Sequence, residues 1–309
     1  MPNVIEVQNL KKTYALAKGK TLEAIKGTSF FVEKGEIFGI LGPNGAGKTT
    51  TLEIIEGLKR QSNGSVAVLG CNNLNQADEI KKRIGVQLQS SQYLPYLSLG
   101  ELLDLFASLY GTTADKPKLL GMVDLQEKQH EQVKNLSGGQ KQRFTIATSL
   151  VNNPEILFLD EPTTGLDPHA RREMWKLIKQ INQKGITVVI TTHYMEEAEF
   201  LCHRVAIMDS GKILEIDEPR KLIDRTSDTT QISFFTDRNV DEKIFQSLPE
   251  VKKVYANYPK IFIELSSLDK ISAIIKILKD NQIPFSGFTV KTATLEDVYL
   301  RLTGKEYEE

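Results

Sequence analysis

Three short runs rich in apolar residues stand out along the chain, at residues 37–41, 156–159 and 186–191. None of them alternates between apolar and polar residues, so each is typical of a central strand that is buried on both faces of a parallel sheet. Residues 4–10 and 28–32 do alternate, and we expect them to form a pair of strands. The pattern predicts an α/β fold with a parallel core and an added antiparallel β subdomain.

A helical insert is predicted between the first two of these buried strands. Over residues 98–110 the apolar positions recur at helical spacing, and Ser98 with Glu101 three positions later has the pattern of a capping box. Shorter helical segments follow as far as residue 133. We therefore expect a helical subdomain beside the core.

The pattern changes after residues 226–230, a polar stretch that we interpret as a linker. Beyond it, strand-like and helical segments follow in the order β-α-β-β-α-β, the split βαβ arrangement. The sequence thus predicts a main domain at 1–225 and a small C-terminal α+β domain at 231–309. The second domain carries no visible catalytic constellation, so we expect an accessory or regulatory role for it.

Composition narrows the class of protein. The chain has 309 residues, a net charge of −1 and two cysteines, so neither a basic nucleic-acid-binding footprint nor a disulfide framework is expected. No signal peptide is visible, and no apolar run approaches the roughly 18–20 residues that span a bilayer. Any work at a membrane would require a partner.

A glycine-rich turn joins the first buried strand to a helical segment and has the P-loop pattern. Glycines let backbone N–H groups converge on a phosphate, and the helix start adds partial positive charge. Lys48 would reach the outer phosphates and Thr49 would hold a magnesium ion. An ordinary glycine turn is the alternative. The predicted phosphate-binding residues are Gly42, Pro43, Asn44, Gly45, Ala46, Gly47, Lys48, Thr49 and Thr50.

A second possible anion site lies at a later helix start. Its residues are Ser137, Gly138, Gly139 and Gln140. A serine and two glycines at such a position offer N–H groups that carry no intrahelical bond. Taken alone, the motif is explained as well by a plain helix cap.

Polar residues follow two of the buried strands. Asp160 and Glu161 end one strand, and His193 follows another. In doubly wound sheets, ligands bind at the carboxyl ends of the strands. We therefore expect Asp160 to bind magnesium through water, Glu161 to face an attacking water, and His193 to contact a terminal phosphate.

Tyr14 is expected on a loop upstream of the glycine-rich turn. Its ring could stack on a purine base, or it could pack on the sheet as a strand-end residue. Position alone does not separate the two interpretations.

Together these motifs resemble the ATP-binding subunit of an ABC transporter, over about residues 4–225. Residues 42–49 are similar to the Walker A motif, 136–140 to the LSGGQ signature, and 156–160 to the Walker B strand. The segment 295–304 is similar to the C-terminal tail of drug- and antibiotic-exporter ATPases.

The resemblance implies roles for individual residues. Glu161 would be the catalytic carboxylate, His193 the switch histidine, Tyr14 the adenine-stacking aromatic, and Asp167 part of the D-loop at the nucleotide. Gln89 is similar to the Q-loop glutamine, which contributes to the magnesium site and to catalysis, although Gln87 is an alternative. Lys48 would join Glu161, His193 and Gln89 in catalysis, and Thr49, Gln89 and Asp160 would form the magnesium site.

The resemblance also implies a mechanism and partners. Two copies, or the chain and a close paralogue, would pack head to tail with ATP and Mg²⁺ between Walker A of one and the signature of the other. Hydrolysis would power a separate integral membrane permease at the inner face of the cell membrane, and no nucleic acid is expected. The alternative is a soluble ABC-type ATPase that acts on nucleic acid or ribosomes. DNA-maintenance relatives, however, place a long coiled coil between Walker A and the signature, and this chain has none.

Overall fold

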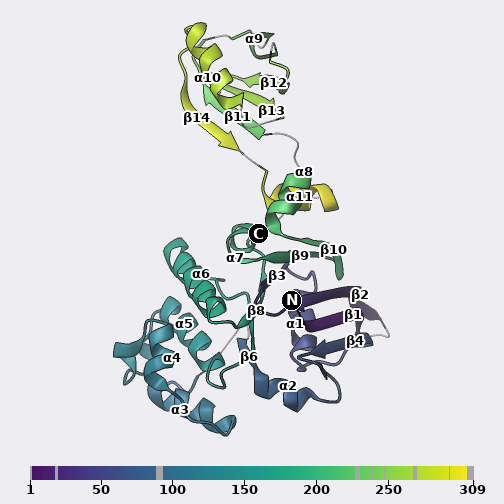
Figure 1. The fold of residues 1–309 in the computed structure, drawn as a ribbon, viewed down its shortest axis with the longest axis vertical. Coiled ribbons are helices and arrows are strands. Elements are labelled where there is room, and N and C mark those ends of the chain that lie inside the picture. The colour runs from purple at the N-terminus through teal and green to yellow at the C-terminus, as the bar shows by residue number, and fades with distance from the viewer. Residues whose placement is uncertain are drawn as a thin grey trace. The chain divides into compact units, whose positions relative to one another are not determined.

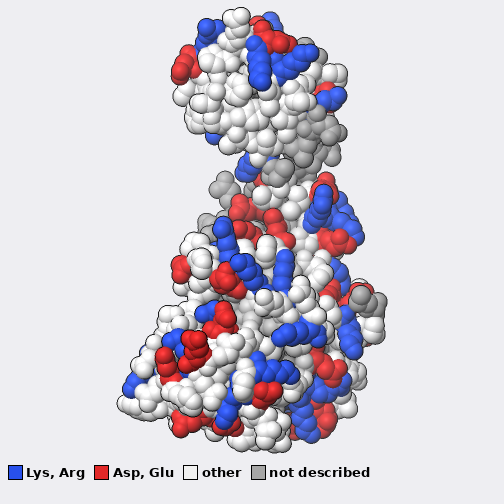
Figure 2. Space-filling view, turned by 60° about the vertical axis from the view of Figure 1, so that its left-hand side comes forward, with Lys and Arg blue, Asp and Glu red and all other residues white. Residues whose placement is uncertain are grey.

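The computed structural model describes residues 2–17, 20–87, 93–226, 230–238, 240–241, 243–246, 248–266, 270–291 and 293–304. The chain divides into two compact units between Pro219 and Arg220, drawn as a ribbon in Figure 1 and in space-filling form in Figure 2. Residues 227–229 of the predicted linker lie outside the described part.

A six-stranded sheet forms the core of the first unit, in the order β10-β9-β3-β8-β7-β6. All neighbouring strands are parallel except the hairpin of β9 and β10. Every residue of β3 and β7 is buried, as their continuous apolar sequence predicts. The strands are β3 (Ile37–Leu41), β6 (Ile84–Gln87), β7 (Ile156–Asp160), β8 (Thr187–Thr192), β9 (Arg204–Asp209) and β10 (Lys212–Asp217).

The register of the core sheet brings three strand ends to one edge. Leu41 lies opposite Thr192, and Asp160 lies opposite Thr191. The segments that follow β3, β7 and β8 therefore leave the sheet side by side. These are the three segments in which the sequence places phosphate-binding and catalytic residues.

An antiparallel sheet, in the order β2-β1-β4-β5, packs its apolar residues into the same core. It comprises β1 (Asn3–Ala15), β2 (Thr21–Glu33), β4 (Asn63–Val68) and β5 (Cys71–Asn72). The first two strands are longer than their alternating pattern predicts. Their polar ends continue as a hairpin because each backbone supplies the hydrogen-bond partners of the other. Tyr14 consequently lies on β1, opposite Leu22, and its predicted loop position is wrong.

The helical insert lies on one side of the core sheet and the antiparallel sheet on the other (Figure 1). Ser98 and Glu101 form the predicted capping box at the start of α3. The insert contains α3 (Leu99–Leu109), α4 (Lys116–Met122), short 3₁₀ turns at Gln126–Lys128 and Val133–Asn135, and α5 (Gly138–Ser149). The other helices of this unit are α1 (Lys48–Ile55), α2 (Ala77–Arg83), α6 (Pro168–Gln183) and α7 (Met195–Leu201).

The second unit has its own apolar core and an antiparallel sheet in the order β12-β13-β11-β14. Its element order confirms the predicted split βαβ pattern. The elements are α8 (Pro219–Thr226), β11 (Thr230–Phe235), α9 (Lys243–Gln246), β12 (Val251–Asn257), β13 (Lys260–Leu265), α10 (Ile271–Asp280), β14 (Ser286–Lys291) and α11 (Leu295–Thr303). Among the described residues of both units, no helix has the length and apolarity to cross a bilayer.

Candidate functional site

The glycine-rich turn between β3 and α1 has the backbone that anion binding requires. Gly45 and Gly47 adopt φ of 81° and 106°, in the left-handed region that favours glycine. A Cβ atom on Gly42 would lie 2.1 Å from the carbonyl oxygen of Met208, so only glycine fits there. No side chain caps the start of α1 at Gly47. The N–H groups of the first turn of α1 are therefore not bound by a capping side chain, and N–H groups in this position can bind an anion.

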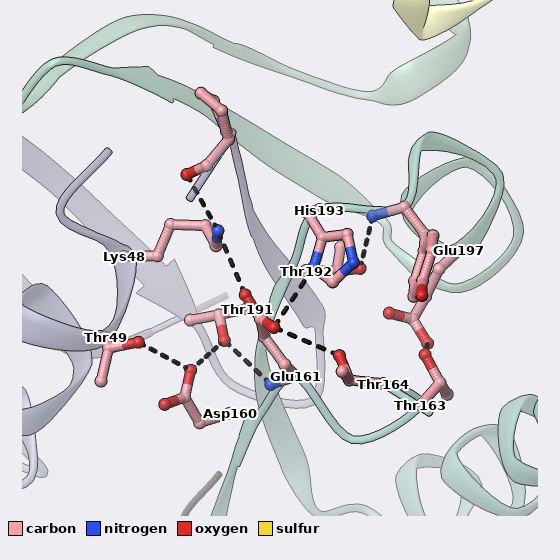
Figure 3. A network of polar contacts seen from close by, with 12 residues as sticks. Lys48, Thr49, Asp160, Glu161, Thr163, Thr164, Thr191, Thr192, His193 and Glu197 are labelled. Carbon is pink, nitrogen blue, oxygen red and sulfur yellow. Dashed lines mark hydrogen bonds and ion pairs between the residues drawn. The ribbon is translucent and has the colours of Figure 1, made fainter. Parts of the chain in front are cut away.

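Lys48 is buried at the centre of the site (Figure 3). Its Nζ donates to the carbonyl oxygens of Gly42 at 2.8 Å and Pro43 at 3.1 Å, and lies 3.2 Å from Oε1 of Glu161. Burial lowers the pKa of Lys48, while the carboxylates of Glu161 and Asp160 oppose that effect. A cation is thus held between the glycine-rich turn and the end of β7.

Asp160 and Thr49 form a pair of oxygen donors. The Thr49 hydroxyl donates to Oδ1 of Asp160 at 3.3 Å, and the Thr191 hydroxyl donates to the same oxygen. Burial raises the pKa of Asp160 in spite of these bonds. Oxygen ligands of this kind suit Mg²⁺, which takes few protein ligands and completes its shell with phosphates and water. In the described part of the chain, no cluster of three His, Cys, Asp or Glu could hold a metal alone.

Glu161 links the lysine to the histidine. Its Oε1 contacts Lys48, and its Oε2 lies 3.2 Å from Nδ1 of His193 and accepts from the Thr164 hydroxyl at 3.2 Å (Figure 3). Burial raises the pKa of Glu161, but Lys48 and His193 together outweigh burial and hold it below its ordinary value. The backbone of Glu161 is left-handed, with φ of 47°, a strained conformation of the kind that collects at functional sites.

The signature residues line a pocket whose lining includes none of the residues of this cluster. Ser137 and Gln140 cap α5 reciprocally, with Ser137 Oγ accepting from the Gln140 N–H and Gln140 Oε1 accepting from the Ser137 N–H. The pocket has a volume of about 470 Å³, and its lining also includes Gly139 and Asp167 but no residue of the glycine-rich turn. Asp167 caps α6 by accepting from the N–H groups of His169 and Ala170.

Tyr14 reaches the turn from the antiparallel sheet. Its hydroxyl lies 3.5 Å from Oγ1 of Thr50, and the Nζ atoms of Lys12 and Lys59 lie 4.9 and 5.9 Å from its ring centroid. The ring therefore adjoins the start of α1 from another layer of the fold.

The structure thus gathers Lys48, Thr49, Asp160, Glu161 and His193 into one cluster, with Tyr14 in contact with Thr50. It puts Ser137–Gln140 and Asp167 in a second pocket. Gln89 lies outside the described residues.

Sequence reasoning missed several polar supports of the cluster. Thr191 binds Asp160, Thr164 binds Glu161, and Thr163 with Trp175 binds Glu197. For Thr191 the available signal was the pair of threonines that ends strand β8.

Comparisons with known proteins agree on one family. The sequence profile described as ABC transporter matches residues 25–164. The chain is 34% identical to the linearmycin resistance ATP-binding protein LnrL of Bacillus subtilis, over 98% of this chain and 99% of the relative. It is 37% identical to the Nod factor export ATP-binding protein I of Burkholderia pseudomallei, over 91% and 92% of the two chains.

Solved structures match the first unit. One is the dimeric, post-hydrolysis state of the ATP-binding cassette MJ0796 bound to ADP and Pi, which is 30% identical with a TM-score of 0.62. The match covers 69% of this chain and 98% of that cassette. These matches support the transporter interpretation of the sequence over the alternative of an ATPase acting on nucleic acid or ribosomes. The chain therefore belongs to the ABC transporter family, in which it is an ATP-binding, ATP-hydrolysing subunit.

Proposed function

We propose that two copies of this chain pack head to tail, bind two molecules of Mg-ATP between them, and use hydrolysis to drive export through a separate membrane permease. Each ATP would contact the glycine-rich turn and Tyr14 of one copy and Ser137–Gln140 and Asp167 of the other. A close paralogue could take the place of one copy.

The observation that carries this proposal is the separation of two helix starts whose residue types suit an anion. The helix start at Lys48 lies in the cluster with Glu161, whereas Ser137 and Gly139 line a pocket without any residue of the glycine-rich turn. One triphosphate needs only one such site within a monomer. In a head-to-tail pair, the glycine-rich turn of one copy and Ser137–Gln140 of the other would bind the same ATP. Closed two-fold symmetry is the commonest arrangement of a homodimer.

The cluster has the charges that phosphoryl transfer requires, because positioning and charge stabilisation carry most of that catalysis. Lys48 would stabilise charge on the outer phosphates. Glu161, kept ionised by Lys48 and His193, would orient or deprotonate the attacking water, and His193 would contact the terminal phosphate.

Magnesium would be held by Thr49 and Asp160, with Gln89 completing the protein's share of the site. When bound, Mg²⁺ neutralises phosphate charge. The oxygen-only character of the Thr49–Asp160 pair supports this assignment.

The permease would anchor the chain at the inner face of the membrane. Support comes from the names of the relatives, which concern linearmycin resistance and Nod factor export. The helical insert and the segment that leads into it also expose large apolar side chains, among them Leu94 and Tyr96 before α3 and Leu109 at its end. Leu94 and Tyr96 lie two positions apart, and exposed apolar side chains that gather in one patch mark a surface that meets another protein.

Glu161→Gln tests the dimer. The variant should bind ATP, form a stable dimer in light scattering, and hydrolyse ATP at least about 100-fold more slowly than the wild type, because the amide cannot accept a proton. Adding Ser137→Arg to this variant should abolish dimerisation but leave ATP binding to the monomer. Hydrolysis by Glu161→Gln at the wild-type rate would disprove the role of Glu161, and an ATP-saturated monomer would disprove the shared site.

The permease is tested by affinity purification of the full chain from detergent-solubilised membranes. An integral membrane protein should copurify, and its yield should fall when Leu94 and Tyr96 are changed to Ser. Recovery of ribosomes or DNA in its place would contradict the proposal.

A further inference from the structure

Glu197 is a buried carboxyl group that no step of the proposed mechanism uses. It lies on α7 with 0% of its surface exposed. Its Oε1 accepts from the Thr163 hydroxyl at 2.8 Å (Figure 3). The same oxygen accepts from Nε1 of Trp175 at 2.7 Å. Burying a carboxyl group is costly unless such partners satisfy it, so this position needs an explanation.

The two donors come from segments that lead to the proposed site. Thr163 follows Glu161 by two residues, in the loop after β7. Trp175 lies on α6, the helix that Asp167 caps. Glu197 itself lies four residues after His193, on the helix that begins two residues beyond the histidine. One carboxyl group therefore joins three segments, each of which carries a residue assigned to ATP binding or hydrolysis.

These contacts form a closed ring of which His193 is a member. His193 contacts Glu161, Glu161 accepts from Thr164, and the adjacent Thr163 donates to Glu197, which returns through α7 to His193. A second tie runs beside it, because the guanidinium carbon of Arg171 on α6 lies 3.8 Å from the ring centroid of Tyr194. The start of α7 is thus fixed at two points to neighbouring segments.

We propose that Glu197 is a positioning residue for ATP hydrolysis, which holds His193 against Glu161 by tying α7 to the loop after β7 and to α6. The inference rests on the proposed roles of Glu161 and His193. Displacing a reacting group by about 1 Å can lower the rate of a reaction about 100-fold. Glu197 therefore acts on turnover through the geometry of His193, without touching nucleotide.

Two substitutions at Glu197 distinguish the role of its hydrogen-bond acceptor from the role of the rest of its side chain. The side chain of Gln has nearly the same size and shape as that of Glu, and its amide oxygen can still accept from Thr163 and Trp175. We expect Glu197→Gln to keep kcat within about threefold and Glu197→Leu to lower it about 10- to 100-fold, with KM for ATP changed by less than about threefold. Glu196→Leu, a change at the exposed neighbour on the same helix, is the matched control and should leave kcat unchanged.

A double-mutant cycle distinguishes positioning from simple support of the core. If Glu197 acts through His193, Glu197→Leu should change single-turnover hydrolysis by less than about threefold in a His193→Ala background. A purely structural role would give the same loss in both backgrounds. Trp175→Phe, which removes one donor but keeps a ring, replaces Glu197→Leu in the cycle if the latter does not fold. The rate measured with Lys48→Ala gives the background of ATP hydrolysis by contaminating enzymes.

The outcomes separate the inference from the proposed function. The positioning role alone is overturned if the wild type is active but Glu197→Leu retains full kcat. It is also overturned if Glu197→Leu lowers the rate by the same factor with and without His193. A wild type whose rate does not exceed that of Lys48→Ala would overturn the proposed function instead.

Discussion

Glu56 is expected to make the first unit less stable as the pH rises. It closes the C-terminal end of α1 and is 1% exposed, and within the described residues neither of its carboxyl oxygens has a hydrogen-bond partner. Burial, with the negative charges of Asp160 and Glu53 as smaller causes, raises the pKa of Glu56 from 4.5 to about 8. At neutral pH the folded protein therefore keeps this proton.

The sign and size of the effect follow from proton linkage. Between pH 4.5 and 8 the unfolded chain releases the proton of Glu56 while the folded chain retains it, so the free energy of unfolding falls as the pH rises. The pKa of Glu56 rises by about 3.5 from 4.5 to about 8. At about 1.4 kcal/mol for each pKa unit, the loss is at most about 5 kcal/mol above pH 8.

Glu56→Gln removes the titration and keeps the shape of the side chain. We expect the variant and the wild type to be equally stable near pH 4.5, with the variant becoming more stable as the pH rises to 8. Urea unfolding between pH 5 and 9 measures this, in EDTA and without nucleotide. Trp175, the single tryptophan of the chain, lies buried in the first unit and reports its unfolding by fluorescence.

Glu127→Gln, a change at an exposed carboxyl group, is the control and should leave the pH profile unchanged. Parallel stability curves for Glu56→Gln and the wild type from pH 5 to 9 would refute the reasoning. Such a result would mean that Glu56 finds a partner or water when it ionises.

Three further results are expected. Gly42→Ala should abolish ATP binding in equilibrium dialysis, because its Cβ would lie 2.1 Å from the Met208 carbonyl oxygen; unchanged binding would contradict this packing. Tyr14→Ala should raise the Kd for ATP by about 5- to 100-fold if the ring stacks on the base, whereas Tyr14→Phe should change it little. A chain that ends at Pro219 should still bind ATP because each unit has its own core, and its dimerisation and ATPase rate will show whether the second unit promotes or restrains the dimer; loss of folding would contradict the division.

Much of the fold follows from local pattern. The runs that became β3 and β7 are apolar throughout, so they had to be covered on both faces, and Ser98 with Glu101 was sufficient to predict the start of α3. The length of the first hairpin was not predictable in this way. Residues 11–15 lack an alternating apolar pattern and become a strand because β2 supplies hydrogen-bond partners to their backbone.

The chemistry of the site divides similarly between sequence and structure. Residue type and spacing alone identified Lys48, Asp160, Glu161 and His193, because a phosphate loop and strand-end carboxylates carry their function in local sequence. Which atoms meet was decided by the parallel register that brings three strand ends to one edge of the sheet. The contacts of Thr191 with Asp160 and of Glu197 with Thr163 could not be predicted from local sequence either. The partners are 31 and 34 residues apart along the chain, and they become neighbours only when the strands and helices pack.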